Sequence, residues 1–123
     1  MNMECEKQAK IELVYMTAPT KIEARAIAHA LVASKLAACV NIFEEVEALY
    51  DWEGDVKTEK ESVMLVKTGM GLSRKITEFV KKEHSYECPC IMVMHPTDGN
   101  KDFFEWVTKI TKVTEVISDH RLT

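Results

Sequence analysis

The sequence predicts a single α+β domain, and three observations support this fold class. The 123 residues are a typical length for one domain. Hydrophobic residues make up 46% of the chain, which is enough for a globular core. Segments with the strand repeat alternate with segments that have the helix repeat, in the order β-α-β-β-α-β followed by a further helix. This order is the ferredoxin-like, or split βαβ, arrangement, in which helices cover one face of an antiparallel sheet.

The domain begins with a strand and a helix. Residues 11–18, IELVYMTA, are rich in β-branched and aromatic residues, as buried strands are, and Pro19 ends this strand. Thr20 and Glu23 then form a capping box, which starts a helix that ends near Lys35. Apolar residues recur along this helix at helical spacing, so we expect one side of it to pack on the sheet.

A long β-hairpin follows the first helix. Strand character resumes at residues 37–43 and continues through residues 46–52, where apolar and polar residues alternate. Gly54 marks a turn, and residues 61–68 form the return strand. We expect the two arms to pair as antiparallel neighbours in the sheet.

The second half of the chain contains a helix, a strand and a short third helix. Apolar residues at helical spacing predict a helix that ends near His84, and residues 89–95, PCIMVMH, predict a strand. Aromatic and apolar residues in 103–110 predict the third helix. The chain thus divides into a polar N-terminal extension, one domain and a C-terminal tail that fits either a strand or a frayed helix, with boundaries at residues 1–10, 11–110 and 111–123.

The far end of the hairpin carries Tyr50 and Trp52, beyond the part of the sheet that two helices can cover. Long exposed strands with aromatic residues pair readily with another chain. We therefore expect an oligomer. The alternative is that Trp52 packs within its own monomer.

Charge and composition exclude several classes of partner. The formal net charge of −4 argues against nucleic acid or an anionic membrane surface, since both require clustered Lys and Arg. The N-terminus has no apolar signal region, and no stretch reaches the roughly 18 apolar residues of a membrane span. A cytoplasmic protein is the expectation. In that reducing compartment the four cysteines are core thiols or soft metal ligands rather than disulfides.

Six separated stretches resemble one known family. They are TAP (17–19), KLAACVNI (35–42), YDWEG (50–54), VKT (66–68), HSYECP (84–89) and G-N…F-x-x-W (99–106). In order and spacing they resemble the CutA family of divalent-cation tolerance proteins, over roughly residues 11–110. The resemblance implies a ferredoxin-like fold, a homotrimer in which long hairpins pair between subunits, and a role in tolerance of copper and other divalent cations.

Four positions depart from the family pattern. Ser85 stands where the family has a proline, and Cys90 where it usually has a glutamate. Phe103 replaces a frequent tyrosine before Trp106. Met16 takes the place of a cysteine that is a proposed copper ligand in some members, although a thioether still binds Cu(I).

The stretch HSYECPC is the first candidate for a metal site. His84 offers an imidazole, Glu87 a carboxylate, and Cys88 and Cys90 thiolates on one face of the predicted strand. This set would suit copper or another soft or divalent ion. The alternative interpretation is an ordinary structural junction between a helix and a strand.

The remaining sulfur residues favour structural roles. Met92 and Met94 continue the alternate positions of the two thiols, and we expect them in the core of a strand buried on both faces. Cys39 lies in an apolar run, which favours a buried core thiol. The sequence shows no nucleophile with a base, no acid–base pair and no Gly-rich phosphate loop. We therefore expect neither catalysis nor an organic cofactor.

Lys67 interrupts an apolar strand, so its ammonium must reach solvent or a partner charge. We expect it to face a cleft between subunits that holds a small anion or a metal-bound ligand. The other residues expected around this cleft are Tyr50, Trp52, Glu53, His84, Tyr86 and Glu87. Alternatively, Lys67 pairs with Glu87 or Glu53 and has only a structural role.

Two other functions compete with metal binding. Trimeric signal proteins of the nitrogen-regulatory PII type are similar in fold and bind nucleotides between subunits. A scaffold would present trimer surfaces to a protein partner and bind no small ligand. Acylphosphatases share the topology, but TAPTK has neither the glycine nor the arginine of their phosphate loop. Tight binding of a soft metal would favour the first function over the other two.

Overall fold

The computed structural model describes residues 10–122, and the side chains of residues 10–111. Its elements are β1 (Ile11–Ala18), α2 (Lys21–Ala33), β2 (Cys39–Trp52), β3 (Asp55–Gly69), α3 (Ser73–Glu83), β4 (Ile91–Met94) and α4 (Lys101–Leu122). The strands form one antiparallel sheet in the order β2-β3-β1-β4. This topology confirms the predicted ferredoxin-like α+β fold.

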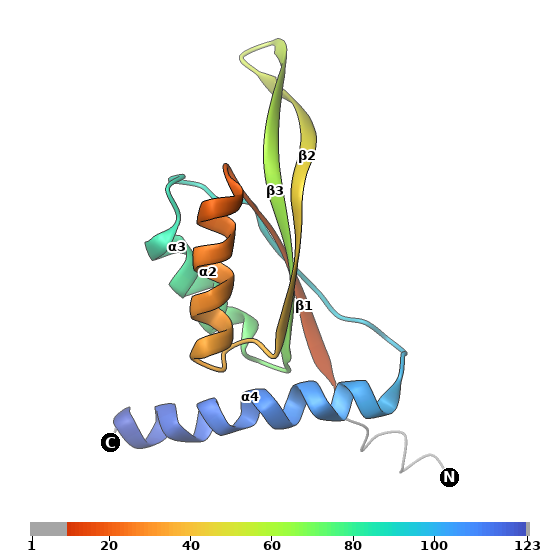
Figure 1. Cartoon of the computed structure of the whole chain (residues 1–123), viewed down its shortest axis with the longest axis vertical. Helices are drawn as coiled ribbons and strands as arrows, with labels where there is room; N and C mark the ends of the chain where they lie inside the picture. Colours follow the sequence, from red (N-terminus) through yellow and green to blue (C-terminus); the bar gives the residue numbers. More distant parts are fainter. Residues whose placement is uncertain (1–9, 123) are drawn as a thin grey trace.

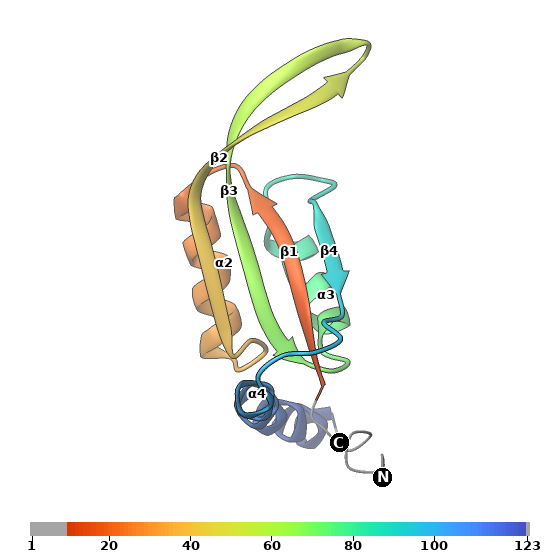
Figure 2. The ribbon, with the colours of Figure 1, turned by 90° about the vertical axis from the view of Figure 1, so that its right-hand side faces the viewer.

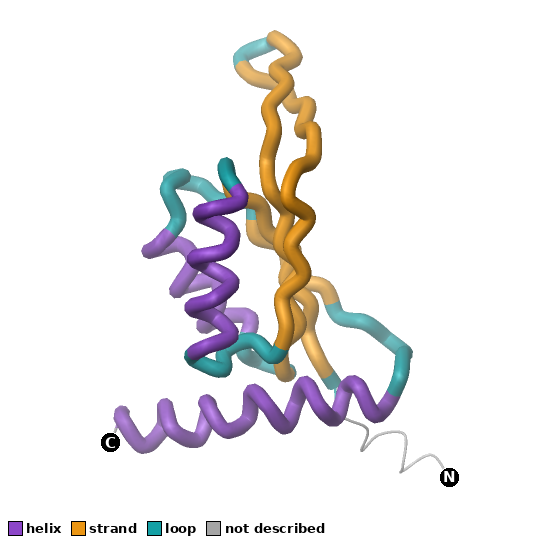
Figure 3. Tube along the Cα trace, viewed as in Figure 1, coloured by secondary structure: helices purple, strands orange, loops and turns teal. Residues whose placement is uncertain are grey.

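The helices divide between one face and one end of the sheet. α2 and α3 lie against the same face, as Figure 1 shows. α4 crosses the end of the sheet where β1 begins and β3 ends (Figures 1 and 2). Within residues 10–122 the opposite sheet face carries no helix, as the colouring in Figure 3 makes clear.

The core lies between the sheet and the pair α2 and α3. Val14 and Met16 of β1 pair in register with Val66 and Met64 of β3, and all four side chains are fully buried. The helices contribute the buried residues Ile27, Leu31, Ile76 and Val80. Burial of each such side chain stabilises the fold by roughly 1.5–3 kcal/mol, so this layer fixes which sheet face the helices cover.

The opposite sheet face is also apolar. Tyr15 pairs with Leu65 on one side and with Met92 on the other, so these three residues share this face. Met92 and Met94 are 52% and 41% exposed, and Phe43 is 52% exposed. The expectation that the two methionines lie in the core is therefore wrong, because helices cover β4 on its other face only.

β2 and β3 form a hairpin that reaches far beyond the helices (Figures 1 and 3). β3 begins at Asp55, earlier than the predicted start at residue 61. The turn residues Glu53 and Gly54 have φ angles of 53° and 91°. Positive φ at both positions is typical of the two-residue turns whose twist matches that of paired strands, so the hairpin pairs up to its tip.

A bulge separates the two halves of the hairpin. The register between β2 and β3 shifts between Phe43 and Val46. There the Ser62 hydroxyl donates a hydrogen bond of 2.6 Å to the carbonyl of Glu44. A bulge bends its strand, and Figure 2 shows the far half of the hairpin curving over the loop between α3 and β4.

The start of α2 uses only half of the predicted capping box. The Glu23 N–H donates to the Thr20 hydroxyl oxygen at 3.2 Å, as predicted. The Glu23 carboxylate instead accepts hydrogen bonds from Ser85. The Glu23 side chain therefore connects α2 to the loop after α3 and does not complete the capping box.

β4 and α4 differ from their predicted lengths. β4 spans only Ile91–Met94, so Cys88 and Cys90 lie before the strand and not in it. The backbone of α4 continues through the tail to Leu122. The predicted N-terminal extension falls outside the described residues, apart from Lys10.

Candidate functional site

A groove lies between the far half of the hairpin and the loop that joins α3 to β4. It has a volume of about 740 Å³. Three aromatic side chains line it, Tyr50 and Trp52 from β2 and Tyr86 from the loop. Their exposed fractions are 38%, 58% and 36%, so solvent reaches all three rings. The groove forms because the bulge bends the hairpin over this loop (Figure 2).

Carboxylates set the charge of the groove. Asp51, Glu59, Glu61 and Glu87 line it, and none of its described lining residues is Lys, Arg or His. Among the side chains of residues 10–111, no basic group forms an ion pair with any of these four. The groove is therefore strongly negative.

Burial and this negative charge together raise the pKa values of three groups in or near the groove. A hydrogen bond to the Glu59 carboxylate is the largest cause that raises the pKa of Tyr50. Burial raises the pKa of Tyr86, and the charge of Glu61 raises it further. Burial and then Glu61 likewise raise the pKa of Cys90. At neutral pH all three groups stay protonated, so they add no charge of their own.

The groove brings together four residues of the predicted cleft, namely Tyr50, Trp52, Tyr86 and Glu87. Glu53 lies in the turn at the tip of the hairpin. These four residues therefore come together within one protomer, and the cleft between subunits stays a prediction. A small anion does not fit a groove whose charged lining residues are all carboxylates.

Lys67 lies elsewhere, on the open sheet face. Its ammonium donates a hydrogen bond to Oδ1 of Asn41 and lies 3.7 Å from Sγ of Cys39. Within one protomer it therefore neither lines the groove nor pairs with a glutamate. Cys39 pairs with Lys67 in register and is half-buried. It is thus a thiol of the open face and not of the core.

His84 is enclosed by backbone groups. Its side chain is 0% exposed. The Tyr86 N–H donates to Nδ1 at 3.0 Å, which leaves the proton on Nε2, and Nε2 donates to the Thr17 carbonyl at 2.8 Å. Both ring nitrogens are occupied, so neither offers a lone pair to a metal ion.

Ser85 fastens the same loop to α2. Its backbone N–H and its hydroxyl both donate to the Glu23 carboxylate, each at 2.9 Å. The carboxylate oxygen that accepts from the Ser85 N–H also lies 3.4 Å from Nδ1 of His84. A proline at position 85 would have no N–H to donate, so this clasp depends on the departure from the family pattern.

The thiols of Cys88 and Cys90 are free and exposed. Cys88 lines the groove. Among the described residues, no three His, Cys, Asp or Glu side chains come together as a metal ion would require. His84, Glu87, Cys88 and Cys90 therefore do not form a closed metal centre within one protomer.

Two further predicted residues lie apart from the groove. Met16 is fully buried in the core, so its thioether is packed against other side chains. Trp106 is 44% exposed on α4, and its ring centroid lies 5.9 Å from that of Phe103. Neither residue contributes to the groove.

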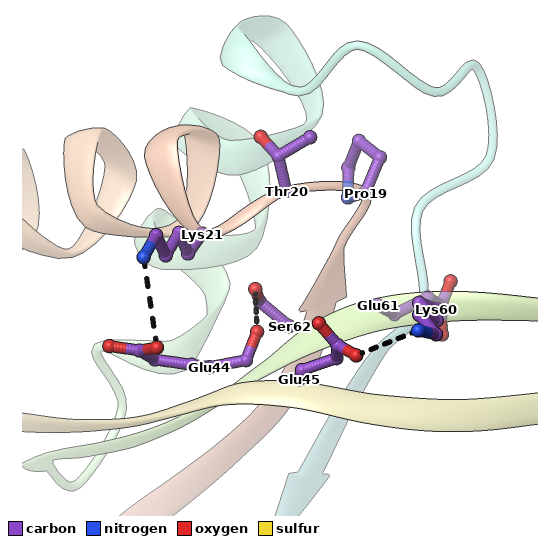
Figure 4. Close-up of a pocket in the computed structure, with 8 residues that line it drawn as sticks. All are labelled: Pro19, Thr20, Lys21, Glu44, Glu45, Lys60, Glu61 and Ser62. Atoms are coloured by element: carbon purple, nitrogen blue, oxygen red, sulfur yellow. Dashed lines mark hydrogen bonds and ion pairs between the residues drawn. The ribbon is translucent and has the colours of Figure 1, made fainter.

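A second hollow lies beside the bulge, and Figure 4 shows its lining residues. Its volume is about 280 Å³. Here acidic and basic groups compensate each other. The Glu44 carboxylate lies 3.1 Å from Arg25 and 3.8 Å from Lys21, and Glu45 lies 3.3 Å from Lys60. These exposed pairs occupy the charges that a ligand would use, so we do not regard the hollow as a functional site.

Sequence reasoning did not identify Glu59 and Glu61 as groove residues. The E-K-E spacing places both on one face of β3, opposite Ala48 and Val46 of β2. Tyr50, two residues after Ala48, shares that face. Lys57 lies opposite Tyr50 in the register but does not line the groove. The alternation of side chains along the strands could have predicted that Glu59, Glu61 and Tyr50 share a face. The bend that brings this face over the loop after α3 depends on the bulge.

Comparison with known proteins places the chain in a family. A family model described as the CutA1 divalent ion tolerance protein matches residues 12–110. The chain is 39% identical over 100 residues to the divalent-cation tolerance protein CutA of Thermus thermophilus, covering 81% of this chain and 97% of that one. It is also 34% identical over 109 residues to the chloroplastic protein CutA of Arabidopsis thaliana. That match covers 89% of this chain and 60% of the length of the relative.

Solved structures agree with this assignment. The CutA1 structure from Ehrlichia chaffeensis has a TM-score of 0.80 and 34% identity, and covers 84% of this chain and 96% of that one. The CutA structure from Archaeoglobus fulgidus has a TM-score of 0.78 and 38% identity, with 82% and 98% covered. In the described part of this chain no helix is long and apolar enough to span a membrane. The chain belongs to the CutA1 divalent ion tolerance protein family.

Proposed function

We propose that this chain is a divalent-cation tolerance protein that acts as a homotrimer and catalyses no reaction. The observation that carries the proposal is the family match over residues 12–110, which spans the whole sheet and its two covering helices. Relatives at 39% and 40% identity are named divalent-cation tolerance proteins. The absence of catalysis is inferred from the lack of a nucleophile with a base in the sequence, and it agrees with His84, whose ring nitrogens are both held by backbone groups.

The metal ligands in this proposal are Cys88 and Cys90, supported by Glu87. Both thiols are free and exposed in one short loop, and thiolates prefer soft ions such as copper. His84 is left out because its nitrogens are already bonded. Within one protomer these three side chains are not gathered around one point, so a second copy would complete the coordination. Free thiols also require a reducing compartment, and we propose the cytoplasm.

The homotrimer is supported by the open sheet face. Phe43, Met92 and Met94 are between 41% and 52% exposed there. Met92 pairs in register with the partly buried Tyr15, which pairs with Leu65. An apolar patch of this kind on a small domain is typical of a subunit interface. The long hairpin offers a further surface for pairing with another copy.

The test is a titration of the reduced protein with Cu(I), Cu(II) and Zn(II), using a competing chelator. We expect tight binding of about one ion per subunit. A Cys88→Ser/Cys90→Ser variant should lose it, whereas a Cys39→Ser variant should keep it because that thiol lies on the open sheet face. If the Cys88→Ser/Cys90→Ser variant binds copper as tightly as the unmodified protein, the metal site lies elsewhere.

A further inference from the structure

We propose that the groove under the hairpin binds a small organic cation that carries more than one positive charge, such as a linear polyamine. This inference goes beyond the proposed tolerance function, because its ligand is neither a metal ion nor a protein. It rests on three features of the groove: its size, its carboxylates that lack basic partners, and its aromatic walls.

The size of the groove suits a small molecule. Its volume of about 740 Å³ lies within the roughly 300–1,000 Å³ that is common for ligand sites. Residues far apart in sequence build it, from both arms of the hairpin and from the loop after α3. Hydrogen bonds from Ser85 to Glu23 and from Tyr86 to His84 hold this loop in place. One wall of the groove is therefore held in place before a ligand arrives.

The charge of the groove selects a cation. Its four carboxylates have no basic partner among the described side chains, in contrast to Glu44 and Glu45 in the second hollow. Like charges that line one groove repel one another, and a bound cation would relieve that repulsion. The raised pKa of Tyr50, whose largest cause is its hydrogen bond to the Glu59 carboxylate, agrees with a negative charge in the groove.

The aromatic walls favour an organic cation over a metal ion. Ammonium groups and the methylene groups beside them bind well to the faces of Trp and Tyr rings. Trp52, Tyr50 and Tyr86 supply three such rings. A compact metal ion would need three converging ligands, and the described residues provide no such group. Carboxylates from three separate segments instead match ammonium groups that are spaced along a flexible chain.

The experiment is isothermal titration of the full chain with spermidine at fixed, low ionic strength. We expect saturable binding. Glu59→Gln/Glu61→Gln should weaken it at least tenfold, because it removes two of the four charges and keeps the side-chain size. Trp52→Leu should also weaken it, because it keeps an apolar surface but removes the ring. Size-exclusion chromatography of each variant verifies that its assembly is unchanged.

A matched control separates the groove from net charge. Glu78→Gln/Glu105→Gln removes two exposed carboxylates from α3 and α4, outside the groove. It should leave spermidine affinity within twofold of that of the unmodified protein. Equal weakening by the control, or no binding at all, would overturn the proposal. Undiminished affinity in Trp52→Leu would overturn the part assigned to the rings.

The same titration separates this site from the metal site. Mg²⁺ at matched ionic strength should not displace spermidine, because the ion does not bind to the faces of the aromatic rings. Efficient displacement by Mg²⁺ would contradict the proposal of an organic ligand. Cys90→Ser changes a thiol outside the groove, so it should keep spermidine binding even where it weakens copper binding. The two proposals can therefore fail independently of each other.

Discussion

A buried imidazole fastens the end of α3 to β1. His84→Ala would leave the Thr17 carbonyl and the Tyr86 N–H without their partner inside the protein, and would open a cavity. We expect the free energy of unfolding to fall by about 2–4 kcal/mol. Urea denaturation at a fixed protein concentration measures this loss.

The control for this change is His29→Ala. His29 is exposed on α2, so its replacement should change the free energy of unfolding by no more than about 0.5 kcal/mol. Copper affinity provides the second readout. Copper affinity should be the same in His84→Ala as in the unmodified protein. If the folded variant no longer binds copper, His84 is a metal ligand after all.

Ser85 tests whether a departure from the family pattern has a structural consequence here. Ser85→Ala keeps the N–H donor to Glu23 and loses the hydroxyl, whereas Ser85→Pro loses both. We expect destabilisation of about 1 kcal/mol for the alanine variant and a larger loss for the proline variant. The readout is the denaturation midpoint of each variant, with and without Glu23→Ala. If the clasp is real, neither Ser85 substitution should cost additional stability once Glu23 is absent.

At the scale of elements, one carboxylate connects β1, α3 and the end of β4. Leu72 at the N-cap of α3 has no capping side chain, and the Ser73 N–H donates instead to the Glu12 carboxylate at 3.0 Å. His95 lies 2.9 Å from the other oxygen of Glu12. Burial raises the pKa of Glu12, but the hydrogen bonds from His95 and Ser73 outweigh it, so the pKa is lowered from its usual 4.5.

This lowered pKa makes stability depend on pH in a definite direction. The folded state prefers the charged form of Glu12, so the stabilisation is complete above pH 4.5 and is lost as the pH falls through the lowered folded-state pKa. Glu12→Gln should cost about 1 kcal/mol at neutral pH. The difference in denaturation midpoint between the two proteins should shrink below pH 4.5. If this difference in midpoint stays constant down to pH 3, the charge of Glu12 does not contribute to the stability.

The order of elements follows from the sequence, but the lengths of β3, β4 and α4 do not. Alternation and the helical repeat identify β1, α2, both arms of the hairpin and α3 because each has a regular apolar side. β4 is shorter than predicted because apolar residues on both sides of Pro89 read as strand, although only Ile91–Met94 pair with β1. The composition of Cys, Pro and Met does not distinguish a loop beside a sheet from the sheet itself.

The candidate site was predictable only in part, for reasons that lie in the whole molecule. Tyr50 and Trp52 stand out from the sequence because they lie beyond the helices. Glu59 and Glu61 join them through the bend at the bulge, which no local pattern specifies. Lys67 lies beside Asn41 and Cys39 and outside this groove, because a lysine in an apolar strand indicates an exit to solvent without indicating the sheet face. Long-range geometry therefore decides which charges share a site.

Assembly is the property of the whole molecule that the open sheet face determines. Met92→Glu places a charge at a half-exposed position on that face, where a lone protomer tolerates it but a buried subunit interface does not. We expect light scattering to give three times the 14.0 kDa chain mass for the unmodified protein and a smaller mass for the variant. Ile22→Glu is the matched control, because Ile22 is 76% exposed on α2 and should not affect assembly. Circular dichroism should show the same fold in both variants. An unchanged mass for Met92→Glu would exclude this sheet face as the trimer interface and leave the hairpin as the remaining surface for assembly.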